Sequence, residues 1–214
     1  MQIQCPKCSA PMQTMQVEQT QIDRCTSCEG LWFDALEDTD LRALCMKQFE
    51  AADNMTDALA ALCLLANCDC PERERALAAF YDKWKTEPLV VDKWLAVQAT
   101  TRLRSALADV KRLMTHPAFS IRNPNKVYAL IGGFRGNQVH FHAADGSGYA
   151  FLAEQVIALD AINPQVAARM ARGFDRWKKF DAGRQAHARA ALEQLRDAKG
   201  ISKGVLEIAT RALA

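Results

Sequence analysis

Four cysteines near the start of this 214-residue chain constrain its fold more than any other feature. They form two C-x-x-C pairs, Cys5 with Cys8 and Cys25 with Cys28. A two-residue gap lets a tight turn direct two thiolates to one point, and two such turns supply the four sulfur ligands of tetrahedral zinc. The stretch between the pairs reads as two short strands, over residues 12–18 and 21–24. We therefore predict a small β zinc ribbon that holds one structural Zn²⁺.

The predicted metal site is structural because four cysteines leave no open position for a water molecule. A unit of about 40 residues buries too little surface to fold alone. Metal binding of about 10–16 kcal/mol would supply the missing stability. Trp32 and Phe33 follow the second cysteine pair. They would either pack over the zinc site as a miniature core or form a small docking surface.

Charge is distributed unevenly along the chain. Residues 1–40 hold two basic and seven acidic side chains, a net charge of −5, so the remainder carries +7 of the total of +2. DNA binding depends mainly on Lys and Arg side chains that neutralise phosphates, so this acidic ribbon is expected to bind nucleic acid poorly. The shift in charge also indicates two units. We place them at residues 1–42 and 43–214.

The N-terminal residues carry a family resemblance. The strings CPKCSAPM and IDRCTSCEGLWFD, with every cysteine in place, are similar to the small bacterial zinc-ribbon family named after the ribbon of transcription factor TFIIB. The resemblance covers about residues 1–42. It implies a four-cysteine zinc site, and the name of the family raises the possibility of a nucleic-acid-associated regulator.

From about residue 41 the pattern changes to helices. Asn123-Pro124 and Asn163-Pro164 each place a capping residue before a proline, which suits the first helical position. The helix that starts after Asn163 is expected to run to Trp177. Gly200 is a typical residue after a helix end, and Ser202 is a typical cap for one further helix. Roughly eight or nine helices with short loops predict an all-α bundle or an irregular solenoid.

This helical part resembles the C-terminal domain of the bacterial aminopeptidase N family, zinc aminopeptidases of the gluzincin class. The marker strings include QFEAADNMTDALAAL, LVVDKWLAVQAT, HPAFSIRNPNK and FHAADGSGYAFL, and the similarity runs from about residue 45 to residue 214. The resemblance implies an irregular α-helical superhelix that caps a catalytic domain and closes its peptide cavity. The expected fold is therefore mainly α, preceded by the small β ribbon. Only about half of that domain would be present, so we expect exposed apolar surface near the join at residues 41–45.

The catalytic motif of that family is missing from this sequence. Zinc aminopeptidases of this class need H-E-x-x-H on a helix, where two histidines bind the metal and the glutamate acts as base. None of His116, His140, His142 and His187 is followed by Glu, and no G-x-M-E-N string is present. His140 and His142 alternate as in a strand or loop. The resemblance therefore implies the architecture and not the catalysis.

Four residues are candidates for lining the peptide cavity, by resemblance alone. Asn123, Asn125 and Arg169 correspond to family positions near that cavity. Tyr128 stands where relatives tend to carry Arg, which weakens any inherited contact with a substrate carboxylate. The alternative for each residue is a role in capping or in pairing between helices.

No segment of the sequence indicates a membrane or a secretory route. The longest uncharged apolar run, Ala58–Ala66, is far shorter than the ~20 residues of a spanning helix. The first residues lack a basic region followed by an apolar stretch, as a secretory signal would have. The eight cysteines are then read as reduced or metal-bound, and we expect a cytoplasmic protein.

Three hypotheses follow for the function. The first is a non-catalytic zinc-binding scaffold that works through protein contacts, or a decayed gene product of the same make-up that has no selected role. The second is the complementing C-terminal part of a split zinc aminopeptidase, whose partner chain supplies the catalytic domain. The third is a regulator associated with nucleic acid through the zinc ribbon.

Overall fold

The computed structural model of the chain describes residues 4–5, 8–17, 20–29, 31–32 and 35–214, without the side chains of 16–17, 20–22, 31–32 and 35–39. The chain forms two compact units, Met1–Glu72 and Arg73–Ala214. Within the described ranges, no helix combines the length and the apolar character that crossing a membrane requires.

The first unit begins with a three-stranded antiparallel sheet. Strands β1 (Met12–Val17) and β2 (Thr20–Cys25) form a hairpin in which Met12 pairs with Cys25. Strand β3 (Leu31–Trp32) lies on the other side of β2, giving the order β1-β2-β3. The two predicted strands are confirmed. The third was not predicted, because two residues are too few to show an alternating pattern.

Two helices complete this unit, α1 (Ala35–Ala51) and α2 (Met55–Leu65). Asn54 caps α2 by accepting a hydrogen bond from the main-chain N–H of Asp57 at 3.0 Å. Helix α1 continues without a break across residues 42 and 43. The division proposed there therefore marks a change of sequence pattern within one helix, with no linker.

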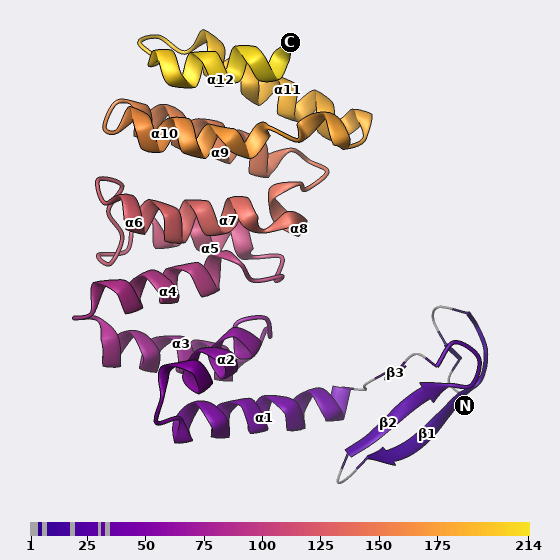
Figure 1. The fold of residues 1–214 in the computed structure, drawn as a ribbon. Helices are drawn as coiled ribbons and strands as arrows, with labels where there is room; N and C mark the ends of the chain where they lie inside the picture. The colour runs from indigo at the N-terminus through magenta and orange to yellow at the C-terminus, as the bar shows by residue number, and fades with distance from the viewer. Residues whose placement is uncertain (1–3, 6–7, 18–19, 30, 33–34) are drawn as a thin grey trace. The chain divides into compact units, whose positions relative to one another are not determined.

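The second unit is entirely helical. Figure 1 shows its helices stacked in successive layers from α3 to α12. Its α-helices are α3 (Pro71–Trp84), α4 (Pro88–Ala99), α5 (Ala106–Leu113), α6 (Pro124–Val127), α7 (Gly133–Gly136), α8 (Gln138–Phe141), α9 (Ser147–Asp160), α10 (Pro164–Ala171), α11 (Ala182–Asp197) and α12 (Lys203–Leu213). A π-helical turn over Tyr128–Gly132 joins α6 to α7, and 3₁₀ turns cover Arg172–Phe174 and Trp177–Lys179.

The predicted capping residues start the helices as expected. Asn123 accepts from the N–H of Asn125 at 3.0 Å, and Asn163 accepts from the N–H of Val166 at 3.2 Å. Gly200 follows α11 with φ at +76°, a left-handed conformation that glycine adopts without a steric cost. Local capping chemistry therefore sets these helix boundaries.

Two sequence predictions in this unit are wrong. His140 lies in the short helix α8, not in a strand or loop, because Asn137 caps that helix. The helix that starts after Asn163 was predicted to reach Trp177, and it ends at Ala171. A tight turn with glycine at position 173 follows, where the chain packs closely against neighbouring side chains.

The core of the second unit contains a cluster of aromatic rings. Phe134, Phe141, Phe151, Tyr149 and Phe174 are each at most 2% exposed. Phe134 and Phe151 meet edge to face with ring centroids 5.4 Å apart, a favourable arrangement for aromatic pairs. These rings come from α7, α8, α9 and the turn after α10. They fix α7, α8 and the turn after α10, which surround a cavity in this unit.

Candidate functional site: a four-cysteine metal centre

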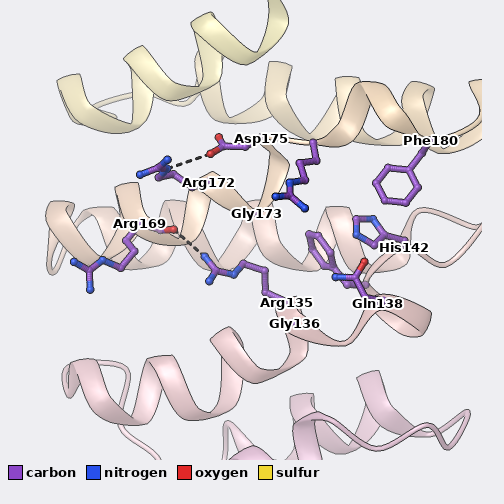
Figure 2. Close-up of a pocket in the computed structure, with 11 residues that line it drawn as sticks. Arg135, Gly136, Gln138, His142, Arg169, Arg172, Gly173, Asp175 and Phe180 are labelled. Atoms are coloured by element: carbon purple, nitrogen blue, oxygen red, sulfur yellow. Dashed lines mark hydrogen bonds and ion pairs between the residues drawn. The ribbon is translucent and has the colours of Figure 1, made fainter.

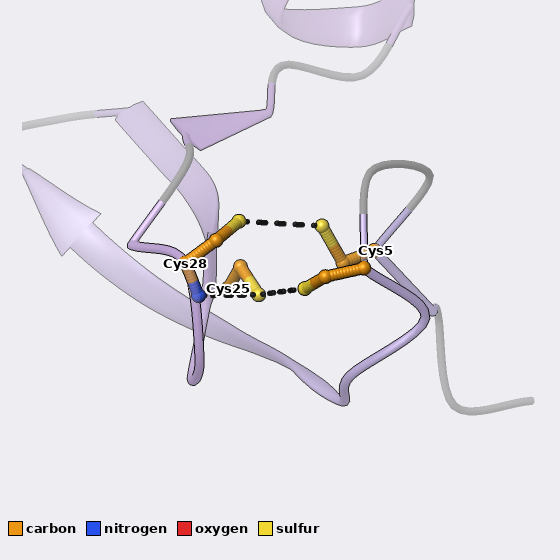
Figure 3. Close-up of side chains that lie close together, drawn as sticks. Cys5, Cys25 and Cys28 are labelled. Carbon is orange, nitrogen blue, oxygen red and sulfur yellow. Dashed lines mark hydrogen bonds between the residues drawn. The ribbon is translucent and has the colours of Figure 1, made fainter.

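The four cysteines converge in the first unit. The Sγ atoms of Cys5 and Cys28 are 3.7 Å apart, and those of Cys8 and Cys25 are 3.4 Å apart (Figure 3). All four sulfur atoms lie within 4.8 Å of one another. Zinc–sulfur bonds of about 2.3 Å place the sulfurs of a tetrahedral site about 3.8 Å apart. The cluster therefore has the size and the donor set of a zinc site.

Two similar turns build this cluster, one for each pair. Ser9 and Glu29 directly follow the second cysteine of each pair, and both have positive φ, at 59° and 56°. This conformation is uncommon for residues other than glycine and costs about 1–2 kcal/mol per residue. The N–H of Ser9 also donates to the carbonyl oxygen of Cys5 at 2.8 Å. The backbone is thus held in the tight turn that the C-x-x-C spacing predicts.

Backbone N–H groups prepare one sulfur for metal binding. The N–H groups of Cys28 and Ser27 both donate to the Sγ of Cys25 at 3.4 Å. Led by the bond from Cys28, these contacts lower the pKa of the Cys25 thiol to about 6. Hydrogen bonds to the thiolate favour the ionised form, which is the form that binds zinc. A structural zinc ion fits this donor set.

The cysteines are also the centre of the ribbon's small core. Cys5 and Cys25 are 1% exposed, and Met12 is the other buried side chain of this cluster. Ala10 and Cys28 pack against them. The possible roles of Trp32 and Phe33 fall outside the described side chains and stay predictions.

The histidines do not form a second metal site. The cysteine cluster is the one group of three or more His, Cys, Asp or Glu ligands that the described residues bring together. His116 packs edge to face on Tyr81, with ring centroids 5.0 Å apart. His142 places Nδ1 at 2.8 Å from the hydroxyl of Tyr149. Burial lowers the pKa values of both His116 and His142, which favours their neutral forms.

The residues predicted to line a peptide cavity lie in the second unit. Asn123 and Asn125 are exposed at the start of α6, where Asn123 acts as the helix cap. The guanidinium of Arg169 lies 5.6 Å from the centroid of the Tyr128 ring, a cation–π contact. Asn123 therefore caps a helix, and Arg169 and Tyr128 form a contact between helices. Their part in the cavity of a larger enzyme stays a prediction.

A cavity of about 500 Å³ lies between the elements around α7, α8 and α10 (Figure 2). Arg169 is on its wall, whereas Asn123, Asn125 and Tyr128 are not. The cavity is lined by Arg135, Gly136, Gln138, Phe141, His142, Arg169, Arg172, Gly173, Asp175, Arg176 and Phe180. In the sequence, Arg172 and Arg176 help to make the C-terminal helices basic, a pattern that indicates a solvated face or a face that attracts acidic surfaces or peptide termini. No local pattern could place Arg135 beside Arg172 and Arg176, because tertiary packing brings them together.

Two family models match the chain. The model described as a transcription factor zinc-finger (Zn_ribbon_TFIIB) covers residues 4–42. The model described as a domain of unknown function (DUF3458_C) with ARM repeats covers residues 26–214. The matches overlap where the ribbon passes into α1. They agree with both resemblances found in the sequence, and together with the cysteine cluster they identify a zinc ribbon with one structural Zn²⁺.

The chain is similar to aminopeptidases from several bacteria. It is 45% identical over 186 residues to aminopeptidase N of Escherichia coli, covering 86% of this chain and 21% of that protein. It is 41% identical over 171 residues to aminopeptidase N of Haemophilus influenzae, covering 79% of this chain and 20% of that protein. The chain thus spans about a fifth of the length of these curated relatives.

A solved structure shows the same fold. The crystal structure of Legionella pneumophila aminopeptidase A in complex with aspartic acid matches with a TM-score of 0.79 and 36% identity. The match covers 83% of this chain and 21% of that chain. The helical part is therefore an aminopeptidase N C-terminal type of domain, as the resemblance implied.

Proposed function

We propose that this chain, which belongs to the family of ARM-repeat domains described by the DUF3458_C model, is a non-catalytic, zinc-binding interaction protein. The zinc ribbon and the aminopeptidase-type helical unit together form a scaffold that acts through contacts with another protein. We place this scaffold in the cytoplasm, where thiols stay reduced and available to zinc.

The kind of metal site carries this proposal. Catalytic zinc needs an open coordination position for water, and the four-cysteine cluster closes all four positions. A gluzincin site needs two histidines on one helix with a glutamate between them, and this sequence has no such string. The helical unit thus has the architecture of an aminopeptidase domain without the groups that perform hydrolysis.

Exposed leucines in the first unit support a protein partner. Leu41 and Leu44 are 48% and 60% exposed, and they lie three residues apart on one face of α1. Leu64 of α2 is 59% exposed. Neighbouring exposed apolar side chains, as Leu41 and Leu44 are, are typical of interaction surfaces. Apolar surface was expected near the join at residues 41–45, where two of these leucines lie.

The ribbon itself favours protein over nucleic acid as its partner. Arg24, one of its two basic residues, forms an ion pair with Glu29 at 3.0 Å. Zinc bound by four thiolates adds two further negative charges. A ribbon with this charge has little with which to neutralise phosphates. We therefore expect no shift of duplex DNA at physiological salt, and salt-sensitive DNA binding by the purified chain would support the regulator hypothesis instead.

A peptidase assay tests the non-catalytic proposal. The purified full chain is loaded with zinc and given alanine p-nitroanilide, with the Escherichia coli relative as a positive control. The proposal predicts no release of nitroaniline above the rate in buffer. Hydrolysis that a chelator abolishes would overturn it.

The similarity to about a fifth of aminopeptidase N favours a second candidate function, the complementing part of a split enzyme. The test mixes this chain with Escherichia coli aminopeptidase N from which the matching C-terminal-type fifth has been deleted. Restored peptidase activity in the mixture, absent from each chain alone, would support the split enzyme. No complex by gel filtration and no activity would leave the scaffold with a different partner.

A further inference from the structure

The arginine-lined cavity of the second unit is built from two separate stretches of the chain, residues 135–142 and 169–180. Arg135 lies on α7, Arg172 and Arg176 follow α10, and Phe180 follows the second 3₁₀ turn. Figure 2 shows Arg135 on one side of the cavity, Arg172 with Asp175 on the other, and the ring of Phe180 near one end. Its volume of about 500 Å³ lies within the range of ligand pockets.

Most of the positive charge in this cavity is not neutralised. Its wall carries four guanidinium groups and one carboxylate, a formal net charge of +3. Asp175 pairs with Arg172 at 3.1 Å. In the described part of the chain, no carboxylate forms an ion pair with Arg135, Arg169 or Arg176. Several unpaired cations on one concave surface favour an anionic occupant.

Arg135 is held in place by close packing. Its guanidinium Nη1 donates to the carbonyl oxygen of Arg169 at 2.9 Å. A Cβ atom at Gly173 would lie 2.8 Å from the Cδ of Arg135 and 2.8 Å from the Cδ2 of Leu152. Gly173 thus leaves the space through which the stem of Arg135 passes. One bond to a carbonyl leaves other N–H donors of this guanidinium available to a ligand.

The cavity has an aromatic end that contributes no charge at neutral pH. The rings of His142 and Phe180 stack with centroids 3.9 Å apart. Burial and the nearby Arg184 lower the pKa of His142, so its ring is neutral. The apolar faces of such rings suit the carbon atoms of an organic ligand rather than a bare inorganic ion.

We propose that this cavity binds an acidic segment of a partner protein, with two or more Asp or Glu carboxylates paired to Arg135 and Arg176. Planar guanidinium groups match carboxylates in a two-bond geometry. The cavity volume exceeds what a single phosphate fills. The negative charge of Asp175 also repels a doubly charged phosphate at one point more strongly than it repels single carboxylates that are spaced apart. The exposed side chains of Arg172 and Arg176 leave the cavity open to a peptide.

This inference rests on the proposed function, since it takes a protein as the partner. The non-catalytic role and the acidic-segment site are overturned by different results. Peptidase activity would overturn the non-catalytic role, whereas peptide binding tests only the cavity. The acidic segment is identified by its carboxylates, so the probes carry blocked ends and offer no terminal charges.

The experiment measures binding of a fluorescent, acetylated and amidated hexapeptide, Gly-Asp-Glu-Asp-Glu-Gly, to the full zinc-loaded chain by anisotropy. The matched probe is its amide counterpart, Gly-Asn-Gln-Asn-Gln-Gly. We expect the acidic peptide to bind, the amide peptide not to bind, and added salt to weaken the binding. Arg135→Gln and Arg176→Gln should each raise the Kd about tenfold or more, because each removes charge-assisted hydrogen bonds.

Lys179→Gln is the matched control, since Lys179 is exposed, lies close in sequence and is not on the cavity wall. It loses the same charge and should change the Kd less than about twofold. Thermal melts of all three variants confirm that the helical unit stays folded. Equal weakening by the Lys179 variant, equal binding of the amide peptide, or complete displacement of the peptide by an equimolar amount of inorganic phosphate would overturn the proposal.

Discussion

Replacing one zinc ligand, in Cys25→Ser, should unfold the ribbon and leave the helical unit intact. The buried side chains described in the ribbon core are Cys5, Met12 and Cys25. Full burial of a methionine contributes about 1.5–3 kcal/mol. A structural zinc contributes about 10–16 kcal/mol. Since the metal outweighs the apolar core several-fold, a ribbon without it has too little to offset its chain entropy.

The helical unit should not respond to this change. Its core, from α3 to α12, lies in a separate compact unit with its own buried side chains. A two-dimensional NMR spectrum of the Cys25→Ser chain should lose the dispersed amide signals of residues 4–32, while the thermal midpoint of the helices shifts by less than about 2 °C. Cys63→Ser is the control, because Cys63 is an exposed residue of α2 outside the metal cluster. It should retain the zinc and the full spectrum.

Two results would refute this reasoning. Dispersed ribbon signals in Cys25→Ser without zinc would mean that the ribbon core folds without the metal. Collapse of the helical transition would mean that the units depend on each other for stability. A zinc-free wild-type chain, prepared with a chelator, should reproduce the Cys25→Ser spectrum, and added zinc should restore the dispersed signals in the wild type alone.

Three other perturbations test further parts of the structure. Without metal the Cys25 thiol has a depressed pKa of about 6, so its contribution to the stability of the folded ribbon is present above the unfolded-state pKa and is lost as the pH falls through 6. Because protons compete with zinc for the thiolates, zinc release to a chromogenic chelator should be low at about pH 7 and should rise as the pH falls below about 6. Asp160→Ala removes two hydrogen bonds that the Asp160 carboxylate accepts from Ser202, one from its N–H at 2.6 Å and one from its Oγ at 2.5 Å. The free energy of unfolding in urea should fall by about 2–4 kcal/mol. Gly148→Ala would place a Cβ atom in steric conflict with the carbonyl oxygen of Phe141, and the thermal midpoint should fall by an amount that corresponds to about 1–3 kcal/mol. An unchanged chelation profile, urea midpoint or thermal midpoint would contradict the respective prediction.

Local chemistry made the metal centre and many helix starts predictable. The C-x-x-C spacing alone places two sulfurs on one turn, and the structure brings Cys5, Cys8, Cys25 and Cys28 together as expected. The Asn-Pro pairs and Ser202 cap helices because their side chains accept from N–H groups two or three residues later. These features depend on neighbours in the sequence, which a pattern can show.

Features that depend on tertiary packing were not predictable in the same way. The end of α10 at Ala171 reflects the close approach of Gly173 to Arg135 and Leu152, which lie in other helices. The arginine-lined cavity likewise needs residues from α7 and from the turn after α10. Arg172 and Arg176 look like part of a solvated face in the sequence, because nothing nearby in the chain marks their approach to Arg135.

The most direct test of a non-catalytic zinc scaffold is the number of zinc ions that the full chain retains. The chain is equilibrated with excess zinc, passed through gel filtration with a weak chelator, and measured by mass spectrometry of the metal. A single closed four-cysteine site predicts one zinc ion per chain. A second zinc ion held equally tightly would reveal a further metal site, and would contradict the proposal that this chain is a non-catalytic scaffold with one structural zinc ion.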